Sequence, residues 1–307
     1  MRDWIRDFSS RIKKIGNDDL FPLWECDTSE RGVTCVRDYA AFIQMVGKMH
    51  FLATHPEMRS DKSDHQVYKV FYRGQRNYHN RLLKPYAYRG KNPKHEEVDG
   101  EIKQWIHTIK QTRLVKGLAA EHSDEVVEAL LQQYGGRTRW LDVVDNIWVA
   151  LWFACMRTFS AYDEGTGLDF VEYRVRDCRC ERESKRFAYI HVVTVKDGKG
   201  SYYIAENDEL LDLRNELPSF YIRPHAQHAV MVRRRNNDGF ADDYRDMIVA
   251  TIKIPLDIAL TWLGSCMPES LSVMSMFPSP YFDTGWRDLL IAQTQAKVFV
   301  FKQMICA

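Results

Sequence analysis

The chain has 307 residues, 45% of them hydrophobic, so it is long enough to bury a full core. Its formal net charge of +1 and its mixed charge pattern argue against general binding to nucleic acid or to anionic membranes. The seven cysteines are scattered and odd in number, and the N-terminus has no signal-peptide pattern. No stretch approaches the length of a transmembrane helix. We therefore expect a reduced, cytoplasmic protein that does not enter the membrane.

Two helices are predicted near the N-terminus, where apolar residues recur at helical spacing over residues 4–15 and 36–51. Between Pro56 and His65 the chain turns polar and this periodicity stops. We therefore predict an N-terminal helical extension over residues 1–60 and a larger domain over residues 61–307.

The larger domain is predicted to begin with a strand at residues 68–72, which Arg73 and Gly74 end. Two amphipathic helices are predicted at residues 101–114 and 124–134. Ser123 is the expected cap of the second helix, and Gly135 stands where a left-handed terminating residue belongs.

The stretch over residues 132–154 is the centre of the predicted domain. Its apolar run over residues 147–154 is too apolar for a surface helix and too short to span a bilayer, so we predict a core helix, capped by Asp145 or Asn146. Burying polar groups beside such a helix is costly unless they satisfy one another or meet a ligand, and the sequence leaves both possibilities open. The polar residues in the turn ahead of it are Arg137, Thr138, Arg139 and Asp142.

Strand patterns dominate the second half of the chain. Residues 172–186 hold six basic and four acidic residues, which favours a solvated loop over a binding site. Helix is concentrated in the first half, so the order predicts an α+β fold rather than repeated βαβ units. In this fold, helices mainly from the N-terminal half pack on a mixed or antiparallel sheet built mainly from the C-terminal half. The predicted strands cover residues 187–195, 202–205, 229–232, 248–254 and 298–301.

Two polar motifs are candidate sites. Arg73 stands at the end of a strand with Gly74 behind it, and a guanidinium is suited to bidentate recognition of phosphate. A buried ion pair between Arg73 and Asp142 is the structural alternative. The second motif sets Arg223, His225, Gln227 and His228 just before and into a strand. The two imidazoles could serve acid/base chemistry or simply bond to backbone.

The sequence lacks the motifs of several common metal, nucleotide-binding and catalytic sites. The C-x-C at residues 178–180 has no second cysteine pair at zinc spacing, and the histidines at positions 225 and 228 lack a third ligand. We therefore expect no metal. The sequence has no G-x-G-x-x-G fingerprint, no P-loop and no G-x-S-x-G elbow.

Four motifs together resemble the FRG domain, a family found in bacteria and phages. They are YRGQ at residues 72–75, YGGRTRWLDVVDNIWVALWFA at 134–154, RPHAQ at 223–227 and MFPSPYF at 276–282. The family hallmark is an aromatic-Arg-Gly followed by Gly-x-x-Thr-Arg-x-Leu-Asp ahead of an apolar helix, and the resemblance extends from about residue 67 to the C-terminus. Tyr72 replaces the usual phenylalanine, and Gln133 stands where a histidine is usual.

The Y-R-G at the end of an early strand and the R-P-x-x-Q ahead of a later strand are similar to ADP-ribosyltransferases of the arginine-serine-glutamate type. In those enzymes the arginine holds the NAD phosphates, and a later glutamate stabilises the positive charge as nicotinamide leaves. The resemblance implies that Gln227 takes the place of the glutamate. A neutral amide supplies no full negative charge, so Glu206, Glu209 and Glu216 are alternatives.

The resemblance implies that Arg73 holds phosphate and that Thr138 and Arg139 line the pocket. Our candidate catalytic residues are Gln227, His225 and Arg139, and our candidate binding residues for NAD are Tyr72, Arg73, Gly74, Thr138, Asp142 and Arg223.

The leading hypothesis is an intracellular effector, of the toxin or phage-defence type, that binds NAD and transfers its ADP-ribose to a protein or nucleic-acid acceptor, or releases it. The predicted extension is then a candidate surface for an antitoxin or regulator. One alternative is a nucleic-acid-binding or nuclease-like module, suggested by the arginines at 233–235 and by the basic and aromatic residues over 76–89. The other is a non-enzymatic partner-binding domain.

Overall fold

The computed structural model describes residues 4, 24–26, 32–59, 61, 63–89, 95–111, 123–163, 168–182, 185–237, 239–264, 271–296 and 303–305. The predicted strand at 298–301 lies outside the described residues, as does the predicted helix at 4–15 apart from Trp4.

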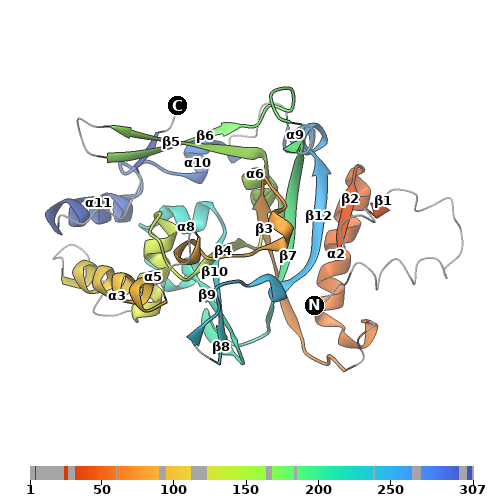
Figure 1. The fold of residues 1–307 in the computed structure, drawn as a ribbon, viewed down its shortest axis with the longest axis horizontal. Coiled ribbons are helices and arrows are strands. Elements are labelled where there is room, and N and C mark those ends of the chain that lie inside the picture. The colour runs from red at the N-terminus through yellow and green to blue at the C-terminus, as the bar shows by residue number, and fades with distance from the viewer. Residues whose placement is uncertain are drawn as a thin grey trace, which may run out of the picture.

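A mixed sheet of ten strands runs through the molecule (Figure 1). Its order is β1-β2-β12-β7-β3-β4-β10-β9-β8, and β11 pairs with β10. β12 runs parallel to β2, and the other neighbouring strands are antiparallel. The strands are β1 (Trp24–Cys26), β2 (Val33–Val36), β3 (Tyr68–Gln75), β4 (Leu141–Val144), β7 (Phe187–Lys196), β8 (Tyr202–Ala205), β9 (Asp208–Asp212), β10 (Ala229–Asn236), β11 (Gly239–Phe240) and β12 (Ile248–Pro255).

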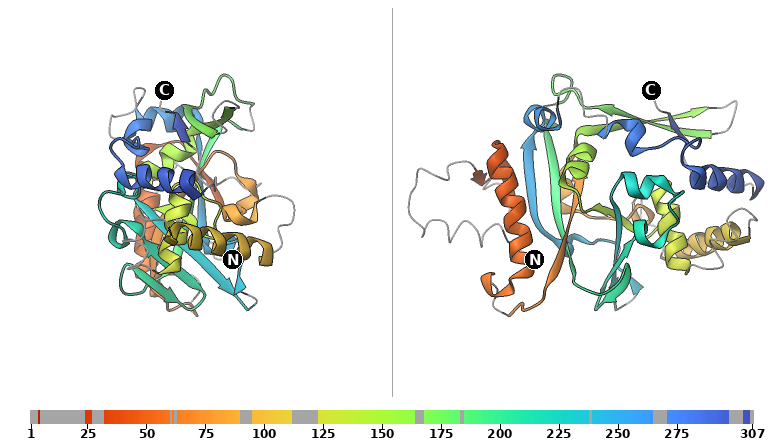
Figure 2. Two further views of the ribbon diagram at one scale, coloured as in Figure 1. Left: turned by 90° about the vertical axis from the view of Figure 1, so that its left-hand side faces the viewer. Right: turned by 180° about the vertical axis from the view of Figure 1, so that it is seen from behind.

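Helices pack at two places on this sheet, as Figure 2 shows from behind. α2 (Tyr39–Thr54) and α6 (Ile147–Cys155) share a core with β3, β7 and β12, and α9 (Leu256–Leu263) joins it. α3 (His95–Gln111), α5 (Asp124–Gln133) and α11 (Thr284–Ala296) form a second core beside β9 and β10. The remaining helices are short: α7 (Leu213–Glu216), α8 (Ile222–Ala226) and α10 (Val273–Met276).

The predicted central helix is confirmed as α6. Its side chains from Val149 to Trp152 are almost fully buried, and the Asn146 side chain caps its start by accepting from Trp148 N at 2.9 Å. The helix before the central turn is also confirmed. Ser123 caps α5 by accepting from the Val126 backbone, and Gly135 follows α5 with a φ of 99°.

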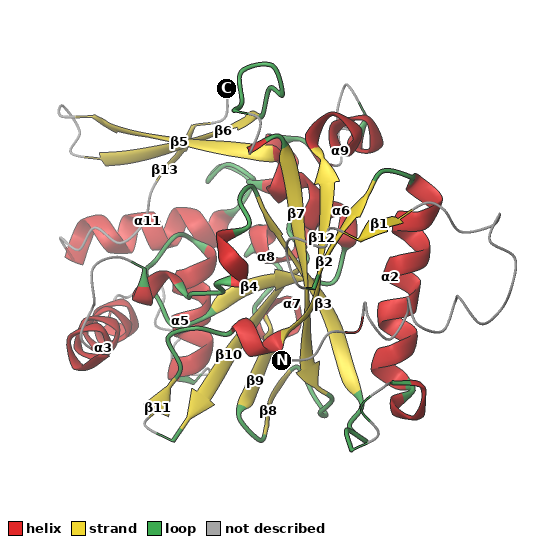
Figure 3. Ribbon diagram, turned by 45° about the vertical axis from the view of Figure 1, so that its right-hand side comes forward, coloured by secondary structure: helices red, strands yellow, loops and turns green. Residues whose placement is uncertain are grey.

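A second, three-stranded sheet follows α6 and projects from the body of the molecule (Figure 3). It contains β5 (Met156–Asp163), β6 (Leu168–Val175) and β13 (Gln303–Ile305). The predicted solvated loop at residues 172–186 is therefore wrong at its start, because residues 172–175 belong to β6. Arg176 is also buried, at 2% exposure, because its guanidinium donates to the carbonyls of Ala154 and Phe187.

The fold is α+β, as predicted, with helices packed on a mixed sheet. Residues from the predicted extension are part of this sheet, since β2 pairs with β12, and α2 packs on β3. Within the described residues, no helix combines the length and the apolar character needed to cross a bilayer.

Candidate functional site

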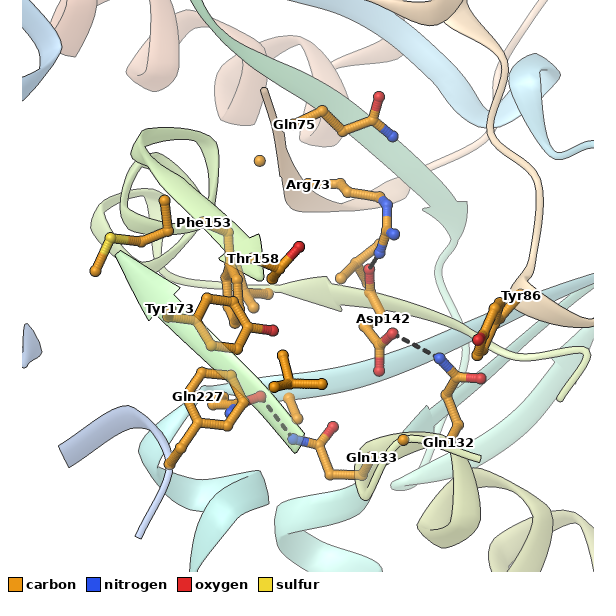
Figure 4. Close-up of a pocket in the computed structure, with 18 of the residues that line it drawn as sticks. Arg73, Gln75, Tyr86, Gln132, Gln133, Asp142, Phe153, Thr158, Tyr173 and Gln227 are labelled. Atoms are coloured by element: carbon orange, nitrogen blue, oxygen red, sulfur yellow. Dashed lines mark hydrogen bonds between the residues drawn. The ribbon is translucent and has the colours of Figure 1, made fainter. Parts of the chain in front are cut away.

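A pocket of about 500 Å³ lies where the main sheet meets the three-stranded sheet (Figure 4). β3 and β4 contribute residues from the main sheet, and β5 and β6 contribute the facing wall. The end of α5, the short helix α8 and Phe277 complete the lining. Six of the nine candidate residues line this pocket, namely Tyr72, Arg73, Gly74, Asp142, Arg223 and Gln227.

Arg73 reaches into the pocket from β3. Its Nη1 donates to the main-chain carbonyl of Asp142 rather than to the carboxylate, and its buried Nε has no hydrogen-bond partner within the described part of the chain. Burial, together with the neighbouring Arg89, lowers the pKa of this guanidinium to about 10. At neutral pH Arg73 is therefore a cation whose charge is incompletely satisfied, which favours an anionic ligand.

Asp142 supplies the only carboxylate among the described residues that line the pocket. Its Oδ2 accepts from Gln132 Nε2 at 2.9 Å, and Thr138 Oγ1 in turn donates to Gln132 Oε1 at 2.8 Å. Burial raises the pKa of Asp142, while Arg73 and this hydrogen bond lower it. Thr138 does not line the pocket but orients Gln132, and so acts on Asp142 through it.

Gln227 is held at the other end of the pocket by two hydrogen bonds. Gln133 Nε2 donates to Gln227 Oε1 at 2.8 Å, and Gln227 Nε2 donates to the carbonyl of Met276 at 2.7 Å. Both glutamines are buried, at 6% and 7% exposure. Both hydrogen bonds fix the orientation of the Gln227 amide, which suits positioning better than charge stabilisation.

Arg223 is a buried cation behind the glutamine pair. Its guanidinium lies over the rings of Tyr134 and Trp286, at 4.5 and 4.2 Å from their centroids. Its Nη1 also donates to the Gln133 carbonyl at 3.3 Å. Arg223 therefore braces this end of the pocket and adds positive charge to it.

Tyr72 and Gly74 contribute to the packing of β3 against α2 and α6. The Tyr72 hydroxyl bonds to His50 Nε2 on α2 at 2.6 Å, and burial raises the pKa of this hydroxyl. Gly74 faces α6, where a β-carbon would collide with the Ala150 carbonyl.

The last two candidates lie outside the pocket lining. Arg139 pairs with Glu128 at 2.6 Å and with Asp99 at 3.1 Å, so it belongs to an internal ion-pair cluster. His225 is exposed on α8. The three alternative glutamates also lie elsewhere: Glu206 pairs with Lys196, Glu209 with Arg233 and Arg235, and Glu216 bonds to Ser201.

Sequence reasoning missed several residues of the pocket. Tyr173 is not among the candidates because the charges over residues 172–186 favour a loop, although the alternation over residues 171–175 is compatible with a strand. Gln133 stands out in the sequence only as a departure from the family pattern. Further lining residues are Gln75, Arg76, Arg89, Gln132 and Phe277.

The lining residues carry a positive charge. Four arginines, Arg73, Arg76, Arg89 and Arg223, line the pocket, whereas Asp142 is the single carboxylate among the described lining residues. No group of three His, Cys, Asp or Glu side chains suited to a metal ion occurs among the residues that the structure describes.

The run of arginines that suggested nucleic-acid binding is engaged within the protein. Arg233 is 1% exposed and pairs with Glu128 and Glu209. Arg234 pairs with Asp208, and Arg235 with Glu209. This run therefore presents little free positive charge to a phosphate backbone.

Comparison with known families confirms the resemblance for the motifs at 72–75 and 134–154, whereas those at 223–227 and 276–282 lie outside the match. Residues 68–163 match the model of the FRG domain, so the chain carries an FRG domain. This segment begins with β3, contains α5, β4 and α6, and ends with β5. It therefore includes Arg73, Gln133 and Asp142, whereas Tyr173 and Gln227 lie beyond it. The chain matches no curated protein and no solved structure.

Proposed function

We propose that this FRG-domain protein binds a phosphate-bearing nucleotide in the pocket, that the nucleotide is NAD, and that the protein transfers or releases its ADP-ribose. The observation that carries the proposal is that four arginines and one carboxylate line the same pocket, with the buried Arg73 Nε lacking a partner in the described residues. Guanidinium groups match phosphate oxygens in charge and in geometry, so a pyrophosphate would satisfy the hydrogen-bonding capacity that Arg73 leaves open.

The size and lining of the pocket also suit a nucleotide. Its volume of about 500 Å³ lies within the usual range of small-molecule sites, about 300 to 1,000 Å³. Tyr86, Phe153 and Tyr173 offer aromatic surface for flat rings, and the glutamine side chains offer donors and acceptors for hydroxyl or amide groups.

Asp142 is the group best placed to assist cleavage. When the bond between the ribose C1 and the nicotinamide nitrogen breaks, its electron pair passes to the ring nitrogen and neutralises the pyridinium. Positive charge then develops on the ribose, where a carboxylate would stabilise it. Water, or the nucleophile of an acceptor, forms the new bond to C1 and loses a proton. In this proposal Asp142 has the role that the sequence suggested for Gln227.

The test is nicotinamide release and NAD binding by the purified protein, with Arg73→Ala compared with Arg157→Ala. Both substitutions remove one arginine, but Arg157 is exposed and does not line the pocket. We expect Arg73→Ala to weaken NAD binding at least about tenfold, in line with the loss of a charged hydrogen bond. Equal NAD affinity in the two variants would overturn the assignment of Arg73, and wild-type protein that neither binds NAD nor releases nicotinamide would overturn the function.

We also propose that this activity serves a cytoplasmic effector of the toxin or phage-defence type. The support is the bacterial and phage distribution of the FRG family. Induced expression in bacteria would test it: we expect the wild type to arrest growth and lower cellular NAD, and Arg73→Ala to do neither. Growth arrest by both proteins would contradict the proposal.

A further inference from the structure

We infer that Gln133 recognises the carboxamide of the ring that leaves, in a subsite formed with Gln227 and Tyr173. This inference rests on the proposed function, because it assigns the nicotinamide end of NAD to one end of the pocket. It also makes Gln133 a determinant of specificity.

The first observation is the hydrogen-bonding capacity that Gln133 leaves open. Its Nε2 donates one hydrogen to Gln227, but no described residue donates to its Oε1. The side chain is only 6% exposed, and Figure 4 shows its amide among the residues that line the pocket. Oε1 is not one of the fully buried, unpartnered atoms of the described chain, so it is open to the pocket, where a ligand or water can donate to it.

The orientation of the Gln133 amide is fixed by its neighbours. Gln227 Nε2 donates to the Met276 carbonyl, so Gln227 must present its oxygen to Gln133. Gln133 must then direct Nε2 toward Gln227, which leaves Oε1 and the second Nε2 hydrogen for the ligand. An amide with one free acceptor and one free donor pairs with a group that has one donor and one acceptor side by side, and a carboxamide is such a group.

Tyr173 provides aromatic surface close to the glutamine pair. Its ring stacks on Phe277, with 4.6 Å between centroids and 24° between planes. Phe277 follows Met276, whose carbonyl holds Gln227. Tyr173 and Gln227 therefore contact the same short segment, and both line the pocket. A flat ring bonded to Gln133 would have Tyr173 as a stacking partner.

The position of Asp142 indicates which ring of NAD binds here. Figure 4 shows Asp142 between Arg73 and the glutamine pair, and Gln132, the neighbour of Gln133, holds its carboxylate. The bond that breaks joins the ribose to nicotinamide. Nicotinamide at Gln133 would bring this bond toward the carboxylate, with the phosphates toward Arg73. Adenine at Gln133 would place the bond far from Asp142.

The experiment is a calorimetric comparison of four ligands: NAD, ADP-ribose, the dinucleotide with nicotinic acid in place of nicotinamide, and the dinucleotide with hypoxanthine in place of adenine. We expect the wild type to bind NAD about tenfold more tightly than the nicotinic-acid form, because a carboxylate cannot donate to Gln133 Oε1. Gln133→Met should remove this preference and leave affinity for ADP-ribose unchanged. Gln75→Met, at the arginine end, is the matched control and should weaken all four ligands alike.

Three results would overturn the inference. If Gln133→Met left the preference for NAD over the nicotinic-acid form intact, the nicotinamide subsite would be wrong. The assignment of phosphate binding to Arg73 would not be affected. If Gln133→Met instead removed discrimination between NAD and the hypoxanthine form, the glutamine would bind adenine. If wild-type protein bound none of the four ligands, the inference and the proposed function would fail together.

Discussion

Gly74 on β3 lies so close to α6 that a β-carbon at residue 74 would be 1.7 Å from the carbonyl oxygen of Ala150. The backbone nitrogen of Ala154 would be only 2.9 Å away. Both are main-chain atoms of a buried helix, so no side-chain rotation could relieve the collision. Gly74 therefore allows β3, which carries Arg73, to pack closely against α6.

We expect Gly74→Ala to lower the free energy of unfolding by about 3 kcal/mol or more, because the helix must move away from the strand. Urea unfolding would measure this change. Gly47→Ala is the control, since Gly47 is exposed in α2 and a β-carbon there meets nothing within 4 Å. That variant should be as stable as the wild type or more stable by up to about 1 kcal/mol. Equal losses in the two variants would contradict the packing argument.

The central helix gives a second stability prediction. Trp152 is fully buried, whereas Trp148 is only partly buried, beside Tyr39. Trp152→Ala should lower the free energy of unfolding by about 3 to 5 kcal/mol, because it opens a large cavity in the core. Trp148→Ala should cost less. Thermal and urea unfolding of both variants would show the order, and a larger loss for Trp148→Ala would contradict the observed burial.

Local patterns predicted the elements that depend on local chemistry. The apolar run of α6, the Ser123 cap and the glycine after α5 could all be identified from neighbours within a few residues. The main polar segments of the pocket could be predicted for the same reason, since Arg73 follows a recognisable strand pattern and Asp142 precedes a recognisable helix, although the structure places them within β3 and β4.

Pairings across long sequence separations could not be predicted. Arg139 is adjacent to Thr138, which orients Gln132 in the pocket. The Arg139 side chain instead pairs with Glu128, which also pairs with Arg233 on β10. The sequence alone gives no sign of this buried cluster. Tyr173 reaches the pocket only because β6 pairs back onto β5, which places it opposite Thr158. The charges on either side of Tyr173 concealed that strand.

The internal cluster around Glu128 allows a third prediction. Glu128 is 1% exposed and pairs with both Arg139 and Arg233. Glu128→Gln should lower the free energy of unfolding by about 3 kcal/mol, because Arg139 and the buried Arg233 each lose one of their two carboxylate partners. Urea unfolding would measure it, with Glu172→Gln as a near-neutral control, because Glu172 pairs with the exposed Arg174 at the surface. A near-neutral Glu128→Gln would show that the cluster does not hold the fold.

His191 gives a prediction about pH. It is fully buried beneath the pocket, between Thr251 Oγ1 at 2.9 Å and Gln75 Oε1 at 3.2 Å. Burial, with Arg81 and Arg73, lowers the pKa of His191 to about 3. Below pH 6.5 the unfolded chain therefore binds a proton that the folded chain does not, so stability falls as pH decreases toward 3.

For this reason His191→Gln should flatten the dependence of stability on pH. Between pH 6 and pH 4, we expect the wild type to lose about 1.4 kcal/mol per pH unit more than the variant does. Urea unfolding at a series of pH values would give both slopes, and the comparison holds even if the variant is less stable throughout. Identical slopes would mean that His191 is already protonated in the folded protein.

A substitution of Asp142 allows the cleavage of NAD to be tested separately from the binding of its phosphates. In the proposed reaction its carboxylate stabilises positive charge on the ribose, whereas the phosphates bind to the arginines. Asp142→Asn should therefore lower the rate of nicotinamide release by at least about a hundredfold, comparable to the loss of other charge-stabilising groups. It should leave ADP-ribose affinity unchanged or increase it, because a negative charge beside Arg73 is removed. Since burial raises the pKa of Asp142, activity should fall on acidification at a higher pH than an ordinary aspartate would give.

The matched control is Asp145→Asn. Asp145 follows the same strand, pairs with Arg214 at 2.7 Å and lies outside the pocket lining. This variant should retain the wild-type rate of nicotinamide release, measured with ADP-ribose affinity on the same samples. A wild-type rate in Asp142→Asn would remove the carboxylate from the proposed mechanism. Loss of both rate and ADP-ribose affinity would instead indicate that the carboxylate maintains the shape of the pocket through Gln132.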